Sequence, residues 1–277
     1  MARQPEGPPP APVAQRLRLR YAKRGRLRFS SHRDFQRAFE RALRRAGVPM
    51  AYSAGFSPHP KVSYAGAAPT GVASEAEYVE IAVTEPLDPE LLRQKLDQSL
   101  PPGLDVLELV EAAPGALAER LQASLWEVRL PGVDAETASA AVHAFLAAPE
   151  VQVQRLMKNG LRTFDARAAV LSAEVLPTPV LSEAEAAAAG PGNGRADSDA
   201  ATPCAILRVV VRHMTPAVRP DDVLAGLRQV ADLVPAAPPG VCRLAQGPLD
   251  ESTGTVGDPL AADRSAVGAT ERSAAQP

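Results

Sequence analysis

Residues 16–47 read RLRLRYAKRGRLRFSSHRDFQRAFERALRRAG, and this stretch contains two different hydrophobic periodicities. From Arg16 to Ala22, arginine alternates with apolar residues, which predicts a β-strand with one buried face. The alternation returns at residues 26–29, after the turn-like residues 23–25. We therefore expect a β-hairpin at the start of the fold.

The same stretch continues as a helix. Ser31 is a suitable N-cap residue with Asp34 three positions later, and Gly47 is a suitable C-terminal stop. Six apolar residues between these signals follow one helical stripe: Phe35, Ala38, Phe39, Ala42, Leu43 and Ala46. This spacing predicts an amphipathic helix over residues 32–46.

The next elements complete a recognisable order. Residues 53–74 form a loop rich in glycine and proline, with a short strand expected at 62–65. Residues 77–84 and 104–110 are typical of strands, and residues 89–100, which open with proline, are typical of a helix. The resulting order β-α-β-β-α-β is that of the ferredoxin-like fold.

The second half of the chain repeats this order. Strands are expected at 124–130, 151–157, 163–176, 205–212 and 241–244, and helices at 134–147 and 221–233. A Pro-Pro-Gly turn leads into the last strand of each half, at residues 101–103 and 238–240, which indicates a duplication. The sequence therefore predicts an α+β protein with tandem ferredoxin-like domains.

We expect these domains at residues 16–112 and 123–245, the second with a flexible insertion at 182–203. The two ends, residues 1–15 and 246–277, are rich in Pro, Ala, Gly, Ser and Thr and have no apolar periodicity. Such composition cannot bury enough apolar surface to fold, so both ends are predicted to be disordered tails.

Composition excludes several classes of protein. The chain has 277 residues, 45% of them hydrophobic, which is enough for one or two domains with a substantial core. No segment approaches the roughly 20 consecutive apolar residues of a membrane span, and the N-terminus lacks a signal peptide, so a cytoplasmic protein without a membrane partner is expected. Two cysteines, Cys204 and Cys242, are too few for a four-thiolate zinc site or a three-cysteine iron–sulfur motif. No cofactor or metal is expected.

Basic residues are concentrated near the N-terminus. Residues 16–45 contain twelve Arg and Lys against two acidic residues, although the formal net charge of the chain is −2. Four arginines form a row opposite the apolar stripe of the predicted helix: Arg33, Arg37, Arg41 and Arg44. Six share one face of the predicted hairpin: Arg16, Arg18, Arg20, Arg24, Arg26 and Arg28.

Like charges that face one another across strands repel, and a polyanion relieves that repulsion. Nucleic acid is the favoured ligand, because rows of arginine neutralise phosphates. An acidic protein would meet the same need, and so would pairing with acidic residues of the second half.

The loop at residues 51–61, AYSAGFSPHPK, is a second candidate region. Prolines on both sides restrict the backbone at His59. Four side chains of this loop are suited to stacking on bases or contacting phosphate: Tyr52, Phe56, His59 and Lys61. His59 could equally be a structural imidazole bonded to backbone, or, like His32 at the start of the helix, an acid or base in RNA cleavage. No catalytic residue is assigned.

Four stretches resemble the radical SAM-linked protein family: residues 21–34, 37–47, 55–61 (GFSPHPK) and 71–78 (GVASEAEY). Members of that family have no known function and are either fused to a radical SAM protein or encoded beside one. This chain lacks the cysteine triplet of the radical SAM enzyme, so the resemblance implies an accessory role with a separately encoded radical SAM protein. The resemblance also implies a role with RNA, because in actinobacteria the genes of this family look to lie near genes for a ribonuclease E/G and for ribosomal proteins.

These observations predict an RNA-binding accessory protein, with tRNA or rRNA as candidate ligands. The basic hairpin and helix would hold phosphates, and Tyr52, Phe56 or His59 would contact bases. One alternative is a metal-independent endoribonuclease using His32, or His59 with Lys61, because CRISPR-repeat endoribonucleases share the tandem ferredoxin-like architecture. The other is a subunit that docks on an acidic surface of the radical SAM protein without RNA.

Overall fold

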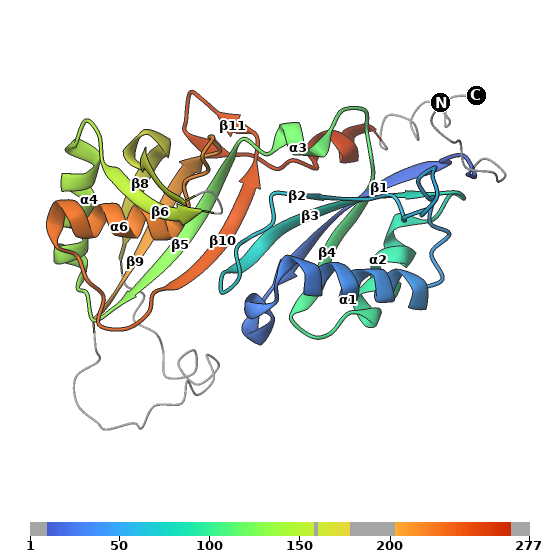
Figure 1. Ribbon diagram of the computed structural model, residues 1–277, viewed down its shortest axis with the longest axis horizontal. Helices are drawn as coiled ribbons and strands as arrows, with labels where there is room; N and C mark the ends of the chain where they lie inside the picture. The colour runs from blue at the N-terminus through green and yellow to red at the C-terminus, as the bar shows by residue number, and fades with distance from the viewer. Residues whose placement is uncertain (1–9, 158–159, 178–202, 267–277) are drawn as a thin grey trace, which may run out of the picture. The chain divides into compact units, whose positions relative to one another are not determined.

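The computed structural model describes residues 10–157, 160–177 and 203–266. The chain divides into two compact units, which Figure 1 shows in colours that follow the sequence. Met1–Leu125 and Cys242–Pro277 belong to the first unit, and Trp126–Val241 is the second. None of the helices in the described ranges is long and apolar enough to span a bilayer.

Strand β1 (Gln15–Lys23) lies in the middle of the sheet of the first unit. It pairs antiparallel with β3 (Ala73–Val83) on one side and with β4 (Leu104–Glu111) on the other. The short strand β2 (Val62–Ala65) pairs antiparallel with the far side of β3. The order β4-β1-β3-β2 is the one that a ferredoxin-like βαββαβ chain forms.

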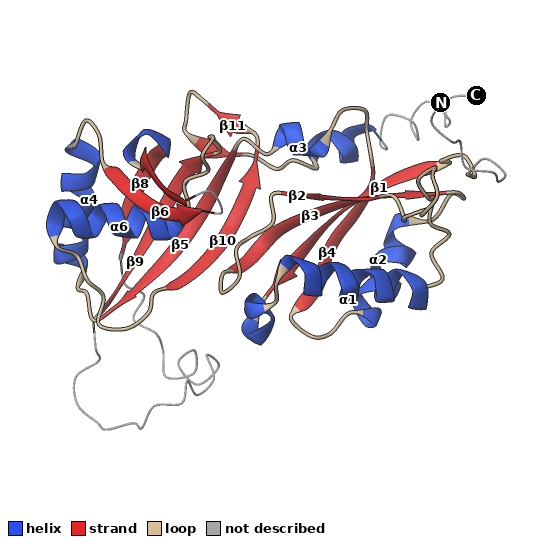
Figure 2. Cartoon of the chain, in the orientation of Figure 1, coloured by secondary structure: helices blue, strands red, loops and turns tan. Residues whose placement is uncertain are grey.

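Helices α1 (His32–Arg45) and α2 (Pro89–Ser99) cover one face of this sheet (Figure 2). The predicted stripe of α1 packs with alternate residues of β1 and β3 to form the core of the unit. Phe39 and Leu19 are fully buried there. The sequence prediction for this helix, its N-cap and its apolar face is confirmed.

The predicted second strand of the hairpin is wrong. Residues Gly25–Phe29 form a 3-10 helix, η1. Both edges of β1 are already paired with β3 and β4, so no ladder remains for a hairpin partner. Gly25 has a φ of 53°, which turns the chain away from β1, and the Arg24 N–H instead donates to the carbonyl of Gly103 at 2.8 Å.

The opposite face of the sheet is covered by α3 (Leu117–Arg120) and by the C-terminal segment. That segment includes β11 (Leu249–Asp250), β12 (Thr255–Val256) and a helical turn over residues 261–266. Leu260 is fully buried with Ala76 and Tyr78.

The expectation of a disordered tail from residue 246 is therefore wrong for residues 246–266. Its composition is poor in apolar residues, but one leucine and one aspartate at suitable positions anchor it to the sheet. The remaining residues, 267–277, lie outside the described part of the chain, as do residues 1–9 of the expected N-terminal tail.

The second unit repeats the alternation of strands and helices. Its strands are β5 (Ala123–Pro131), β8 (Val170–Leu176) and β9 (Cys204–Arg212), and its helices are α4 (Ala135–Ala147) and α6 (Pro220–Ala231). Strand β10 (Gly240–Gly247) begins in this unit and belongs to the first unit from Cys242 onward. The order β10-β5-β9-β8 corresponds to β4-β1-β3-β2 of the first unit. Both halves thus have the strand order of the predicted ferredoxin-like fold.

One strand that the sequence predicts in this unit is divided into two strands in the structure. Residues 163–176 divide into β7 (Gly160–Asp165), the short 3-10 helix η2 (Arg167–Ala169) and β8. Strand β7 pairs with β6 (Gln152–Met157) as a separate two-stranded sheet. The predicted insertion at 182–203 lies outside the described residues except for Pro203.

Candidate nucleic-acid interface

Helix α1 is held at its N-terminus by a reciprocal cap. The Ser31 hydroxyl accepts a hydrogen bond from the Asp34 N–H at 3.2 Å, and the Asp34 carboxylate accepts one from the Ser31 N–H at 3.2 Å. The Ser31 hydroxyl also donates to the Asp34 carboxylate at 2.7 Å. This bond and the one from the Ser31 N–H lower the pKa of Asp34, with a smaller contribution from the charge of Arg37. Because the cap fixes where the helix starts, it also fixes which side chains face solvent.

The solvent face of α1 carries the arginine row, which is defined by Arg33, Arg37, Arg41 and Arg44. All four side chains are exposed, and no hydrogen bond or ion pair joins them to any other described residue. At 1.5 Å per residue the row is about 17 Å long. The structure thus presents, along one side of a helix, four positive charges that form no ion pair with the described residues.

The arginines of β1 do not extend this basic surface. Arg16 donates to Glu80 at 3.1 Å, and Arg18 donates to the same carboxylate at 2.8 Å. Arg18 is only 2% exposed and also pairs with Asp263 at 2.7 Å. Glu80 lies directly opposite Arg18 in the ladder between β1 and β3, so these charges are neutralised inside the fold.

Two further arginines of the predicted hairpin are also paired. Arg20 lies 4.0 Å from Glu108, which is its partner in the ladder between β1 and β4. Arg24 forms ion pairs with Glu75 and with Asp105, the latter at 2.9 Å. The alternative of pairing with acidic residues thus applies to the strand arginines. Asp263, which pairs with Arg18, comes from the second half of the sequence, and the other acids come from the first half.

Arg26 and Arg28 are exposed on η1, immediately before α1. The guanidinium of Arg28 lies 4.7 Å from the ring centroid of Phe29, in a cation–π contact. The Phe29 ring is itself 58% exposed. An exposed aromatic ring, with a guanidinium group over it, therefore precedes the N-terminal end of the arginine row.

The loop 51–61 follows the C-terminal end of α1 and is closed by its own hydrogen bonds. The Ser53 N–H donates to the carbonyl of His59 at 2.9 Å, and the His59 N–H donates to the Ser53 hydroxyl at 3.0 Å. Tyr52 is 45% exposed and Phe56 is 72% exposed. The His59 ring is exposed as well, and Lys61 is half-buried.

The two histidines of the sequence prediction have different neighbours. The His32 ring packs edge-on against Tyr64, with centroids 5.1 Å apart, and its Nε2 lies 3.0 Å from the amide of Gln36. The contacts of His59 are all within loop 51–61. Paired imidazoles for acid–base cleavage of RNA are therefore not assembled among the described residues.

The first unit also contains a buried polar cluster that was not predicted. It consists of Lys23, Ser74, Glu77, Arg243 and Gln246. Arg243 pairs with Glu77 and donates to Gln246 at 3.1 Å. Burial lowers the pKa of Lys23. The available signal was Glu77 at the start of the strand predicted at 77–84, but its partner lies 166 residues away.

This cluster holds the loop that supports η1. The Glu77 carboxylate accepts from the Ala68 N–H at 3.0 Å, and the Lys23 amine donates to the carbonyl of Pro69 at 3.1 Å. The Gly71 N–H then donates to the carbonyl of Arg28 at 2.8 Å. The position of Arg28 is thus linked through backbone to a buried ion pair.

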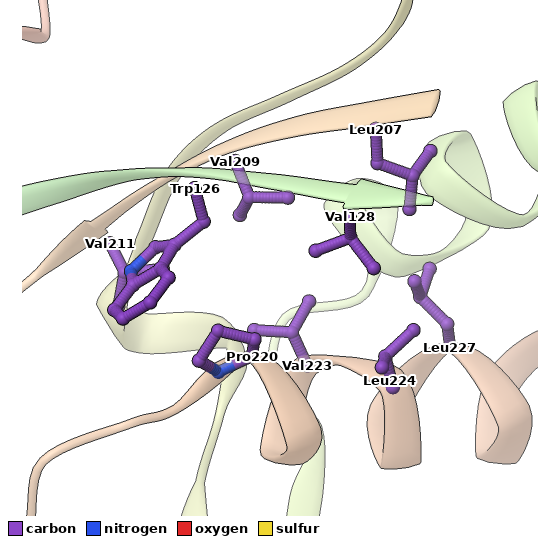
Figure 3. A pocket seen from close by; sticks show the side chains of 9 residues that line it. All are labelled: Trp126, Val128, Leu207, Val209, Val211, Pro220, Val223, Leu224 and Leu227. Atoms are coloured by element: carbon purple, nitrogen blue, oxygen red, sulfur yellow. The ribbon is translucent and has the colours of Figure 1, made fainter. Parts of the chain in front are cut away.

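A small cavity in the second unit carries no ligand chemistry. Its volume is about 10 Å³, and its lining is apolar: Trp126, Val128, Leu207, Val209, Val211, Pro220, Val223, Leu224 and Leu227 (Figure 3). A buried water needs two to four polar partners, which these side chains do not supply. Among the described residues, no group of three or more His, Cys, Asp and Glu side chains is arranged to hold a metal ion.

Comparison with known protein families places the arginine row inside a bacterial domain. Residues 16–220 match the model of a family described as an uncharacterized protein conserved in bacteria, DUF2344. The chain belongs to the DUF2344 family. The matched residues contain η1, α1 and loop 51–61, whereas the C-terminal segment that pairs with Arg18 lies beyond the match. No curated protein matches the chain.

Proposed function

We propose that this DUF2344 protein binds RNA through the arginine row and acts in the cytoplasm as an accessory protein to a separately encoded radical SAM protein. The observation that carries the proposal is the set of four exposed guanidinium groups on α1, none of which forms an ion pair with a described residue. The radical SAM partner is proposed from the resemblance of residues 21–78 to the radical SAM-linked family.

The arginines of strand β1 differ from those of the arginine row in their acidic partners. Where this chain uses arginine for structure, as in β1, a carboxylate lies within 4.0 Å. The row on α1 departs from that rule over about 17 Å. Its four charges repel one another, and phosphates that replace their counterions relieve the repulsion.

RNA binding through four contacts has a calculable salt dependence. With a slope of about −0.7 per phosphate contact for a single strand and about −0.9 for a duplex, affinity should fall about 50- to 150-fold between 50 and 200 mM salt. Fluorescence anisotropy of labelled bulk tRNA measures this slope. The test variant is Arg33→Glu/Arg37→Glu/Arg41→Glu, which should lose binding without a loss of thermal stability, because the three side chains are exposed.

A matched control separates the row from net charge. Lys95→Glu/Arg129→Glu/Arg162→Glu changes the net charge by the same amount at exposed positions on α2, β5 and β7. Retained binding in this control, with loss in the α1 variant, supports the proposal. Equal loss in both, or no binding by the wild-type protein at 50 mM salt, would refute it.

The partner is tested separately. We expect the radical SAM protein encoded beside the gene to co-purify with the wild-type chain. If the complex survives nuclease treatment but is lost in the α1 variant, and tRNA does not bind, the arginine row is a docking surface for an acidic protein. If no complex forms under any of these conditions, the proposed accessory role is wrong. The tRNA-binding experiment then tests RNA binding by itself.

A further inference from the structure

We infer that the RNA held by the arginine row is single-stranded, and that its bases stack on Phe29 beyond one end of α1 and on Phe56 beyond the other. The inference rests on the proposed function and specifies its substrate class. It comes from the distribution of aromatic side chains between core and surface, which is independent of the charges.

The exposed aromatic residues are confined to two places. The chain has 6 Phe, 4 Tyr and 1 Trp. The large exposed side chains among them are Phe29, Tyr52 and Phe56, and the other eight are buried or half-buried. Phe29 precedes α1 by three residues, and the other two lie in the loop that follows it. Aromatic rings exposed beside a basic surface are the residues on which unpaired bases stack.

The structure around Phe29 favours its ring as a surface for base stacking. The five residues of η1 turn the chain so that the ring projects from the fold, and the Arg28 guanidinium lies over it at 4.7 Å. The backbone of Arg28 is fixed by the hydrogen bond from Gly71, which the buried polar cluster supports. A ring held in place loses little entropy when a base stacks on it.

Phe56 is fixed in a different way. The hydrogen bonds between Ser53 and His59 close the loop beneath it, and the Ala51 N–H ties the base of the loop to the carbonyl of Ala82 at 2.8 Å. Near the same end of β3, the Thr84 N–H donates to the carbonyl of Pro49 at 2.9 Å. Loop 51–61 is thus anchored at the C-terminal end of α1, opposite to η1.

The length of α1 sets the length of the ligand. Its 14 residues span about 21 Å at 1.5 Å per residue. A strand with about 3.4 Å per stacked nucleotide covers this distance with roughly six nucleotides. A duplex would offer phosphates to the row, but its bases are stacked on one another and cannot reach the two rings. The geometry therefore favours a single strand.

The experiment uses a 12-nucleotide oligouridine and a 12-base-pair RNA duplex, both labelled with fluorescein, and measures anisotropy with the full chain. We expect Phe29→Leu and Phe56→Leu each to weaken oligouridine binding about 5- to 100-fold, with little effect on the duplex. Leu91→Ala is the matched control, because Leu91 on α2 is 59% exposed against 58% for Phe29. It should bind oligouridine as the wild-type protein does.

A second variant reports stacking directly. Phe29→Trp keeps a ring at this position, so it should retain affinity and show quenched emission when oligouridine binds. The native Trp126 is buried in the second unit and provides a constant background. The affinity for oligouridines shorter than about six nucleotides should depend on only one of the two phenylalanines.

The outcomes separate this inference from the proposed function. If the α1 charge reversal abolishes binding while Phe29→Leu and Phe56→Leu bind like the wild-type protein, or if the duplex binds as tightly as oligouridine, the single-strand inference is wrong and RNA binding by the row stands. If the wild-type protein binds neither RNA, both are wrong.

Discussion

Glu75 and Glu77 lie two residues apart on β3, and each forms an ion pair with an arginine. The Glu77–Arg243 pair is buried, whereas the Glu75–Arg24 pair is half-exposed. Glu77→Gln leaves Arg243 and the neighbouring Lys23 without a carboxylate in the buried polar cluster. We expect this change to lower the free energy of unfolding by about 3–5 kcal/mol, and Glu75→Gln to cost less than about 1 kcal/mol. Urea denaturation measures both, and equal losses would contradict this account of the cluster.

Helix α1 depends on local signals that a single substitution can remove. Ser31→Ala deletes the hydroxyl that accepts the Asp34 N–H, and we expect a loss of about 1 kcal/mol in the free energy of unfolding. Ser31→Thr keeps an oxygen acceptor and should restore most of that loss. Because the N-terminal turn carries Arg33, fraying should also weaken oligouridine binding in the alanine variant. Equal stability of the alanine variant and the wild type in urea would show that packing alone fixes the start of the helix.

For the whole molecule, the C-terminal segment is part of the first unit and not an appendage. The fully buried Asp263 pairs with Arg18 and with Arg120, each through one carboxylate oxygen. Asp263→Ala takes this carboxylate from Arg120 and leaves Arg18 with Glu80 alone, so the free energy of unfolding should fall by about 3–5 kcal/mol. Asp258→Asn removes an exposed ion pair with Arg264 in the same segment but keeps an oxygen that accepts the Leu260 N–H, and it should cost less than about 1 kcal/mol. If thermal unfolding shows the two variants to be alike, the segment does not stabilise the sheet.

Local periodicity predicted the elements of the first unit well. The apolar stripe at 35–46, the cap at Ser31 and the alternation at 77–84 each describe interactions among residues a few positions apart. The same information located the arginine row, because a helical stripe implies an opposite face. It failed at residues 26–29, where the alternation of arginine with apolar residues was read as a strand although β1 had no free edge.

The sequence by itself determined the α+β class, the helix that carries the arginine row and the residue types available for an anionic ligand. The tertiary structure alone decided which arginines remain free. Arg18 is neutralised by Glu80, 62 residues away, and by Asp263, 245 residues away. The charge of an arginine is the same in every context, but its availability depends on the carboxylates that the fold brings to it. Sequence periodicity contains no information about partners at that separation.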